Sequence, residues 1–190
     1  MSELLEYEVI ITDKDGKVIQ RVKGPARSYL KAYNQLRLGQ MSNVVQTVKD
    51  TGGTNRTPTA GDTYLLGMES AEDVVTHGIR YGTGDTAVDI SDYALEAPIG
   101  QGAGAGQLDH YICQAGSPTV SATESAFELK RGAVNGSGDT IIVKEIGVYA
   151  IARQAAVLYY FCIVRDVLGA PVTIPDGGGI TVIYTFKAVE

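Results

Sequence analysis

The beginning of the chain alternates apolar and polar side chains around a turn. One face of this segment carries Tyr7, Val9 and Ile11, and the residues between them, Glu8 and Ile10, face the other side. The turn that follows contains Asp15-Gly16, which supplies the positive φ angle that a tight hairpin needs. Alternation with a period of two is typical of a half-buried strand. The pattern therefore predicts a β-hairpin over residues 4–23.

The next segment has helical rather than alternating spacing. Between residues 26 and 41, apolar side chains recur about every three or four positions, and polar side chains fill the opposite face. The apolar positions are Tyr29, Leu30, Tyr33, Leu36 and Met41. We therefore expect one helix over residues 26–41, followed by strand-like Val44, Val45 and Val48.

From residue 76 onward, short apolar runs alternate with glycine-rich turns. The expected strands cover residues 77–81, 108–114, 121–131, 140–152, 157–168 and 180–189. In the last of these, Ile180, Val182, Tyr184 and Phe186 face one side. Because strands and helices do not alternate along the chain, a doubly wound α/β fold is excluded.

The predicted fold class is mainly β. We expect an antiparallel β-sandwich or jelly-roll-like body at residues 76–190, with an N-terminal hairpin and one helix. Residues 1–50 would hold the hairpin and the helix, as an arm or a packed unit, and residues 51–75 would form a loop-rich connector.

Composition and charge narrow the class of function. The 190 residues carry a net charge of −6, which argues against nucleic-acid binding, since that needs a basic surface. The sequence has no run of 18 apolar residues, so no membrane span is expected. The acidic N-terminus does not resemble a signal peptide. Cys113 and Cys162 are expected to be buried free thiols, unless they lie on facing strands and form a disulfide.

Residues that could carry chemistry are few. The segment 82–87 matches a loose dinucleotide-binding fingerprint, but the extended segment 88–90 follows where a helix would be needed, so we interpret it as a glycine turn. His77 and His110 lack metal-ligand spacing, and the acidic clusters are expected to form a solvated rim. We therefore expect no catalytic, cofactor or metal site.

Two long polar loops, at residues 50–62 and 97–107, are the candidates for interaction. Both are rich in glycine and poor in reactive groups, so they are either flexible connectors or segments that pack closely against a neighbouring copy. We expect a homo-oligomer whose contacts involve these interaction residues: Tyr29, Tyr33, Gly52, Gly53, Asn55, Gly102, Gly104 and Gly106.

Several segments, in this order, are similar to patterns of a known protein class. They are Gly82-Thr-Gly84-Asp-Thr-Ala87, Ser91-Asp-Tyr-Ala-Leu-Glu96, Val143-Lys-Glu-Ile-Gly-Val-Tyr149, residues 161–166, Ile174-Pro-Asp-Gly177 and residues 180–186. Over residues 76–188 the chain resembles small structural proteins of tailed bacteriophages, of the tail-fibre, collar and head-fibre or decoration types. Residues 1–50 carry no such resemblance.

This resemblance implies a non-enzymatic virion component that is assembled in the host cytoplasm and contacts copies of itself and other capsid or tail proteins. The alternative is a carbohydrate-binding β-sandwich module for a host-surface glycan. A hydrolase with an unrecognised carboxylate pair is a third reading of the same residues.

Overall fold

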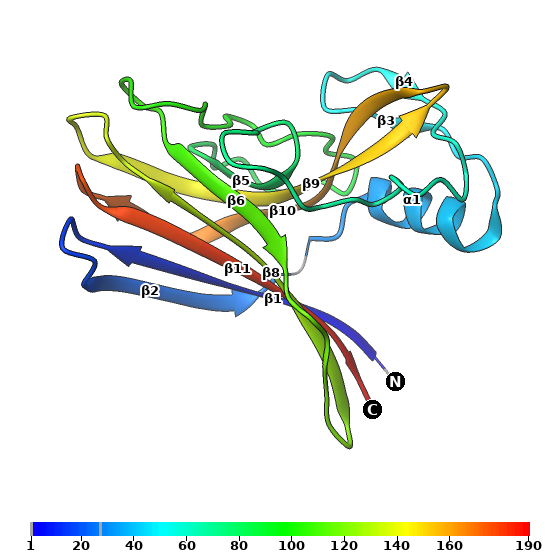
Figure 1. Cartoon of the computed structure of the whole chain (residues 1–190), viewed down its shortest axis with the longest axis horizontal. Helices are drawn as coiled ribbons and strands as arrows, with labels where there is room; N and C mark the ends of the chain where they lie inside the picture. Colours follow the sequence, from blue (N-terminus) through cyan, green and yellow to red (C-terminus); the bar gives the residue numbers. More distant parts are fainter. Residues whose placement is uncertain (1, 27) are drawn as a thin grey trace.

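The computed structural model describes residues 2–26 and 28–190, which form mainly antiparallel β-structure with one helix in this part of the chain (Figure 1). The elements are β1 (Ser2–Thr12), β2 (Val18–Pro25), α1 (Lys31–Ser42), β3 (Val48–Lys49), β4 (Asn55–Arg56), β5 (Gly78–Gly82), β6 (Asp109–Ala115), β7 (Thr119–Val120), β8 (Glu124–Val134), β9 (Ile141–Gln154), β10 (Val157–Ile174) and β11 (Gly179–Val189).

The first sheet, sheet A, has the strand order β2-β1-β11-β8-β6, with β7 paired to β8. The N-terminal hairpin β1–β2 is present as expected, and Val9 and Ile11 are buried. β1 pairs with β11 along its whole length, from Ser2 opposite Val189 to Thr12 opposite Gly179. The two ends of the chain therefore lie side by side, and the hairpin is an integral part of the larger sheet (Figure 1).

The second sheet, sheet B, has the order β10-β9-β5 and packs on sheet A. The expected antiparallel sandwich is confirmed, because the inward positions of both sheets share one buried apolar cluster. Phe127 is half-buried, and other apolar side chains of these strands are buried: Leu129, Ile146, Val148, Val182, Tyr184 and Phe186. Cys113 and Cys162 are buried free thiols.

The helix begins later than the spacing predicts, at Lys31 instead of residue 26. The residues just before it extend along the edge of β10, where the N–H of Leu30 donates to the carbonyl of Ile163 at 2.9 Å. Pairing with this edge satisfies backbone groups that a longer helix would have taken. The expected strand at Val44 and Val45 is also absent, since both side chains are exposed and only Val48 enters a strand.

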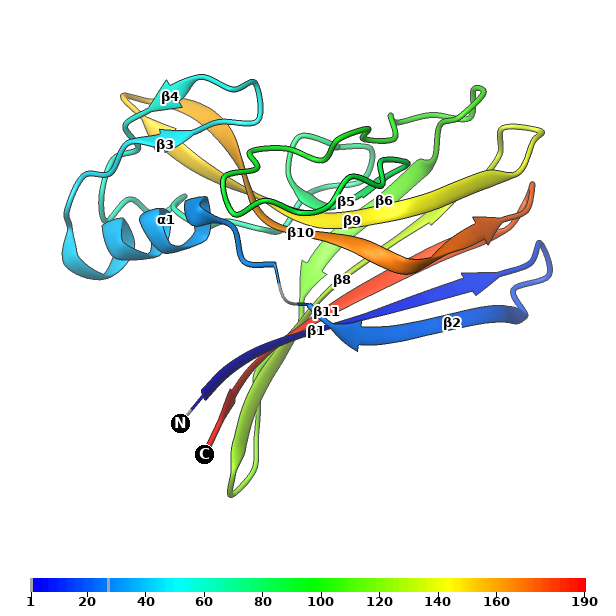
Figure 2. The same cartoon turned by 180° about the vertical axis from the view of Figure 1, so that it is seen from behind.

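Each sheet extends beyond the region where the two face each other (Figure 2). The far ends of β9 and β10 carry α1 and the β3–β4 ribbon. The ends of β1 and β11 project in another direction together with the β7–β8 hairpin (Figures 1 and 2). We call this projection the arm, and it comprises residues 2–5, 119–127 and 186–189.

Candidate functional site

Residues 83–97 form a strap over the outer face of sheet B, and a buried carboxylate holds it there. Glu145 of β9 is fully buried, and its Oε1 accepts hydrogen bonds from the N–H groups of Gly84 at 3.3 Å and Ala97 at 2.8 Å. Its Oε2 accepts from the Arg165 Nε at 2.9 Å. Glu145 therefore fixes both ends of the strap to the sheet.

Arg165 of β10 completes this cluster. Its guanidinium also pairs with Asp92 of the strap at 2.6 Å. Burial disfavours the charge of Arg165, but the hydrogen bonds that it donates to Glu145 and Asp92 outweigh burial and hold its pKa above the ordinary value. Gly147 lies beside the cluster, where a Cβ atom would come within 2.5 Å of the Val164 carbonyl oxygen. Both carboxylates therefore make structural contacts that hold the strap on the sheet.

A second buried cation, Arg131 of β8, binds backbone instead of carboxylates. Its guanidinium donates to the carbonyl oxygens of Val74 at 2.7 Å, Tyr111 at 2.9 Å and Ile79 at 3.1 Å. Burial lowers the pKa of Arg131. This side chain therefore links the connector at residues 51–75 to β5 and β6. The sequence pattern of β8 does not distinguish Arg131 from the exposed Lys130 beside it.

His110 of β6 is fully buried near Arg131 and Arg80. Its Nδ1 lies 2.8 Å from the Leu108 carbonyl oxygen and 2.9 Å from the Gln101 Oε1, so Nδ1 carries the proton of the neutral ring. The Nε2 atom has no hydrogen-bond partner among the described residues. Burial, reinforced by the two arginines, lowers the pKa of His110 to about 4.

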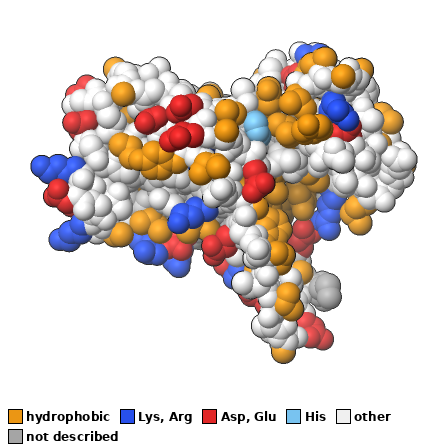
Figure 3. All heavy atoms as spheres, in the orientation of Figure 1, with side chains coloured by type: hydrophobic (Ala, Val, Ile, Leu, Met, Phe, Trp, Pro, Cys, Tyr) orange, Lys and Arg blue, Asp and Glu red, His pale blue; other side chains and the backbone are white. Residues whose placement is uncertain are grey.

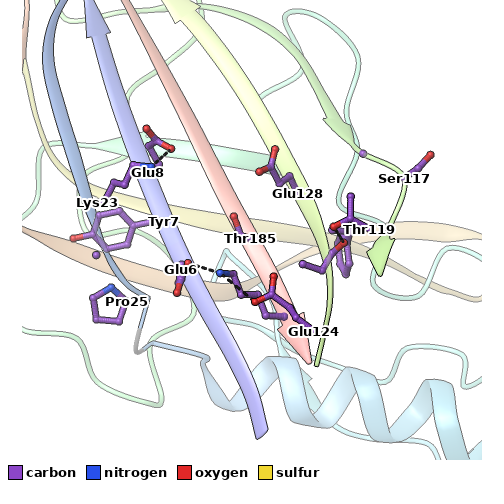
Figure 4. Close-up of a pocket in the computed structure, with 15 residues that line it drawn as sticks. Glu6, Tyr7, Glu8, Lys23, Pro25, Ser117, Thr119, Glu124, Glu128 and Thr185 are labelled. Carbon is purple, nitrogen blue, oxygen red and sulfur yellow. Dashed lines mark hydrogen bonds and ion pairs between the residues drawn. The ribbon is translucent and has the colours of Figure 1, made fainter. Parts of the chain in front are cut away.

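A hollow of about 720 Å³ lies on the solvent face of sheet A (Figure 4). Two ion pairs lie in it: Lys23 approaches Glu8 at 3.0 Å, and Lys187 approaches Glu6 at 2.9 Å. Burial opposes ionisation of Glu8, but hydrogen bonds from Lys23 and Arg21 outweigh it and hold its pKa below the ordinary value.

A second hollow, of about 590 Å³, opens between the arm and α1, and we call it the groove. Phe127 and Phe186 stack in one wall with ring centroids 4.8 Å apart, while Leu66, Met68 and Tyr33 contribute to the other walls. Figure 3 shows hydrophobic side chains gathered where the arm leaves the body. The groove is therefore an apolar concavity that no other described element fills.

The structure brings two of the predicted interaction residues, Tyr29 and Tyr33, together. Their rings stack with centroids 4.2 Å apart, and the Tyr33 hydroxyl donates to Glu3 of β1 at 3.0 Å. Burial is the main cause that raises the pKa of both hydroxyls above the ordinary value. Tyr33 lines the groove, so this predicted residue does lie at a candidate interaction surface.

The predicted residues Gly52, Gly53 and Asn55 lie elsewhere, in the β3–β4 ribbon. Asp50 organises this turn, because its Oδ1 accepts from the N–H groups of Gly52 at 3.0 Å and Thr54 at 2.8 Å. Gly53 has a φ angle of +81°, and a Cβ atom on it would meet the ring of a tyrosine in the strap at 3.4 Å. The side chain of Asn55 is exposed.

The predicted residues Gly102, Gly104 and Gly106 lie at the opposite end of β9 from that ribbon. A Cβ atom on Gly102 or Gly104 would come within 2.6 or 2.8 Å of the Gln107 Oε1, which folds back over the loop. A Cβ atom on Gly136, in the β8–β9 turn, would meet Ala103 at 3.5 Å. The two glycine-rich loops therefore do not form one surface.

Within residues 2–26 and 28–190, no group of three or more histidine, cysteine or acidic side chains could hold a metal ion. In the same part of the chain, no helix has the length and apolar character needed to cross a membrane. Comparison of the chain with protein families, with curated proteins and with solved structures finds no match.

Proposed function

We propose that this chain is a non-enzymatic structural component of a tailed-phage virion. It would act as a tail- or head-associated fibre, adaptor or decoration subunit, through self-assembly and contacts with other virion proteins. Its place would accordingly be the virion, with assembly in the host cytoplasm.

The observation that carries this proposal is how the segments of the resemblance meet in space. Gly84 belongs to the first of those segments and Glu145 to a later one, and they are joined by the 3.3 Å hydrogen bond of the strap. Gly82 and Gly84 are also close to the Glu145 side chain, so a Cβ atom on either would come within 2.7 Å of it. Distant pieces of the pattern thus form one interlocked structural unit, which supports reading the pattern as a single inherited feature.

The chemistry of the described residues supports the same class of function. The buried charges at Glu145, Arg165 and Arg131 are engaged by partners within the chain. The apolar groove, by contrast, offers a surface suited to another protein. Rigid β-structure with uncovered apolar surface is what a subunit of a larger assembly needs.

Mass spectrometry of purified particles, with head and tail fractions separated, tests the proposal. We expect this chain in the particles at a fixed copy number and enriched in one fraction. Absence from purified particles would contradict the proposal. A melting temperature raised by host-surface glycans, in a chain absent from particles, would instead favour the carbohydrate-binding alternative.

A further inference from the structure

The end of α1 and the segment after it form an exposed apolar projection. The side chains of Met41, Val44 and Val45 are 75%, 50% and 60% exposed, and Leu38 beside them is also exposed. We call these four residues the tip. No charged residue occurs between positions 38 and 46. Single exposed apolar residues are common, but such a cluster on a projecting segment indicates a contact surface.

The groove has the complementary properties. Its charged residues are already paired, since Arg37 lies 2.5 Å from Glu3, and Lys187 bonds to Glu6 and lies 3.8 Å from Glu124. An uncharged segment that enters the groove leaves no buried charge without a partner, whereas a charged one would lose hydration with no compensating partner. The electrostatics of the groove therefore select an uncharged apolar occupant.

The size of the groove fits the same occupant. A volume of about 590 Å³ corresponds to on the order of 20 water molecules at roughly 30 Å³ each. This is room for several apolar side chains, and their entry would release that water. The tip supplies four such side chains on a short segment.

We propose that copies of this chain assemble by seating the tip of one copy in the groove of another. The contact joins two different surfaces of the same protein, so repeated contacts build a ring or a filament unless two copies exchange tips. This inference rests on the proposed function in that it names the surface through which the subunits would associate with one another.

Three variants test the contact, each at an exposed position so that folding is preserved. The tip variant is Met41→Glu/Val45→Glu, and the groove variant is Ser125→Arg, which places a long charged side chain at the groove wall. The control is Ile90→Glu, a residue that is 70% exposed and lies in the strap. Sedimentation velocity gives the assembly state, and circular dichroism verifies that each variant is folded.

We expect the wild type and the control to form the same oligomer. The tip and groove variants should each associate about 100-fold more weakly, because each forces an unpaired charge into an apolar contact. An equimolar mixture of the two variants should form a one-to-one complex, since the groove variant retains its tip and the tip variant retains its groove. Groove-to-groove association cannot give this rescue.

A wild-type chain that is monomeric up to about 100 µM would overturn the proposal. An oligomer that survives both variants, or variants that do not complement each other in the mixture, would do the same. Failure of this contact is distinguishable from failure of the proposed function. If the chain is found in particles but the two variants do not complement each other in the mixture, the proposed function stands and the proposed contact is wrong. If the variants complement each other but the chain is absent from particles, the contact stands and the proposed function is wrong.

Discussion

Acidification from pH 7 to pH 5 should destabilise this protein through His110, since most carboxyl groups titrate below this range. The neutral ring donates from Nδ1, and its Nε2 is enclosed without an acceptor in the part of the chain that the structure describes. Protonation of Nε2 would place a donor and a positive charge there, close to Arg131 and Arg80. The folded state therefore binds this proton more weakly than the unfolded chain does.

The size of the effect follows from the two pKa values. His110 has a pKa of about 4 in the folded state, against an ordinary value of 6.5. Because the folded pKa is depressed, the stability contribution is present above about pH 6.5 and is lost as the pH falls towards 4. Linkage gives about 3 kcal/mol in total, of which about 2 kcal/mol is lost between pH 7 and pH 5.

Urea unfolding at pH 7, 6 and 5 measures this loss for the wild type, His110→Asn and His77→Asn. An asparagine amide can still donate to the Leu108 carbonyl but does not titrate, so His110→Asn should lose about 2 kcal/mol less than the wild type over this range. His77 is only half-buried and its pKa is also lowered by burial, so its variant should recover a smaller part. Equal pH slopes for the wild type and His110→Asn would refute this account of the buried ring.

Two further predictions concern the strap. Replacing Arg165 by Met leaves the buried carboxylate of Glu145 without its cationic partner and should lower the free energy of unfolding by about 3–5 kcal/mol. Amide hydrogen exchange should then become faster at residues 84–97. Unchanged protection there would contradict the role of the ion pair. Gly147→Ala should lower the free energy of unfolding, measured in urea, by more than 1 kcal/mol, because its Cβ would lie 2.5 Å from a carbonyl oxygen. Gly169→Ala is the matched control, since its Cβ would have no atom of the described residues within 4 Å. Similar urea midpoints for the two variants would show that the backbone shifts at Gly147 to accommodate the added methyl group.

The strands could be predicted from the sequence because their cause is local. In β11 the buried residues Ile180, Val182 and Tyr184 are two positions apart, and the pleat of a strand turns that spacing into one buried face. The hairpin turn at Asp15-Gly16 is equally local. The pairing of β1 with β11 was not predictable in this way, since many strands of similar pattern compete for the same partner and the choice depends on the whole sheet.

The buried ion pair of Glu145 and Arg165 was missed although a signal existed. Glu145 with its neighbour Lys144, and Arg165 with its neighbour Asp166, interrupt largely apolar runs in strands that are covered on both faces. A charge at such a position is costly unless it is paired, so the two residues could have been proposed as partners. The helix start was missed for a different reason. Tyr29 and Leu30 continue the apolar spacing of the helix, but residues 28–30 pair with the edge of β10 and are therefore extended.

The glycine-rich loops show where sequence reasoning reaches its limit. Glycine marks a place where another group comes close, but the sequence does not say whether that group belongs to the same chain. At Gly102 and Gly104 the close group is Gln107, and at Gly53 it is Tyr93, so these glycines are already explained within one copy. Apolar side chains provide the better criterion for an assembly surface, because water penalises their exposure whatever the local backbone does. By that criterion the proposed contacts between copies are expected at the groove and at the exposed end of α1, while an interaction through the glycine-rich loops stays a prediction.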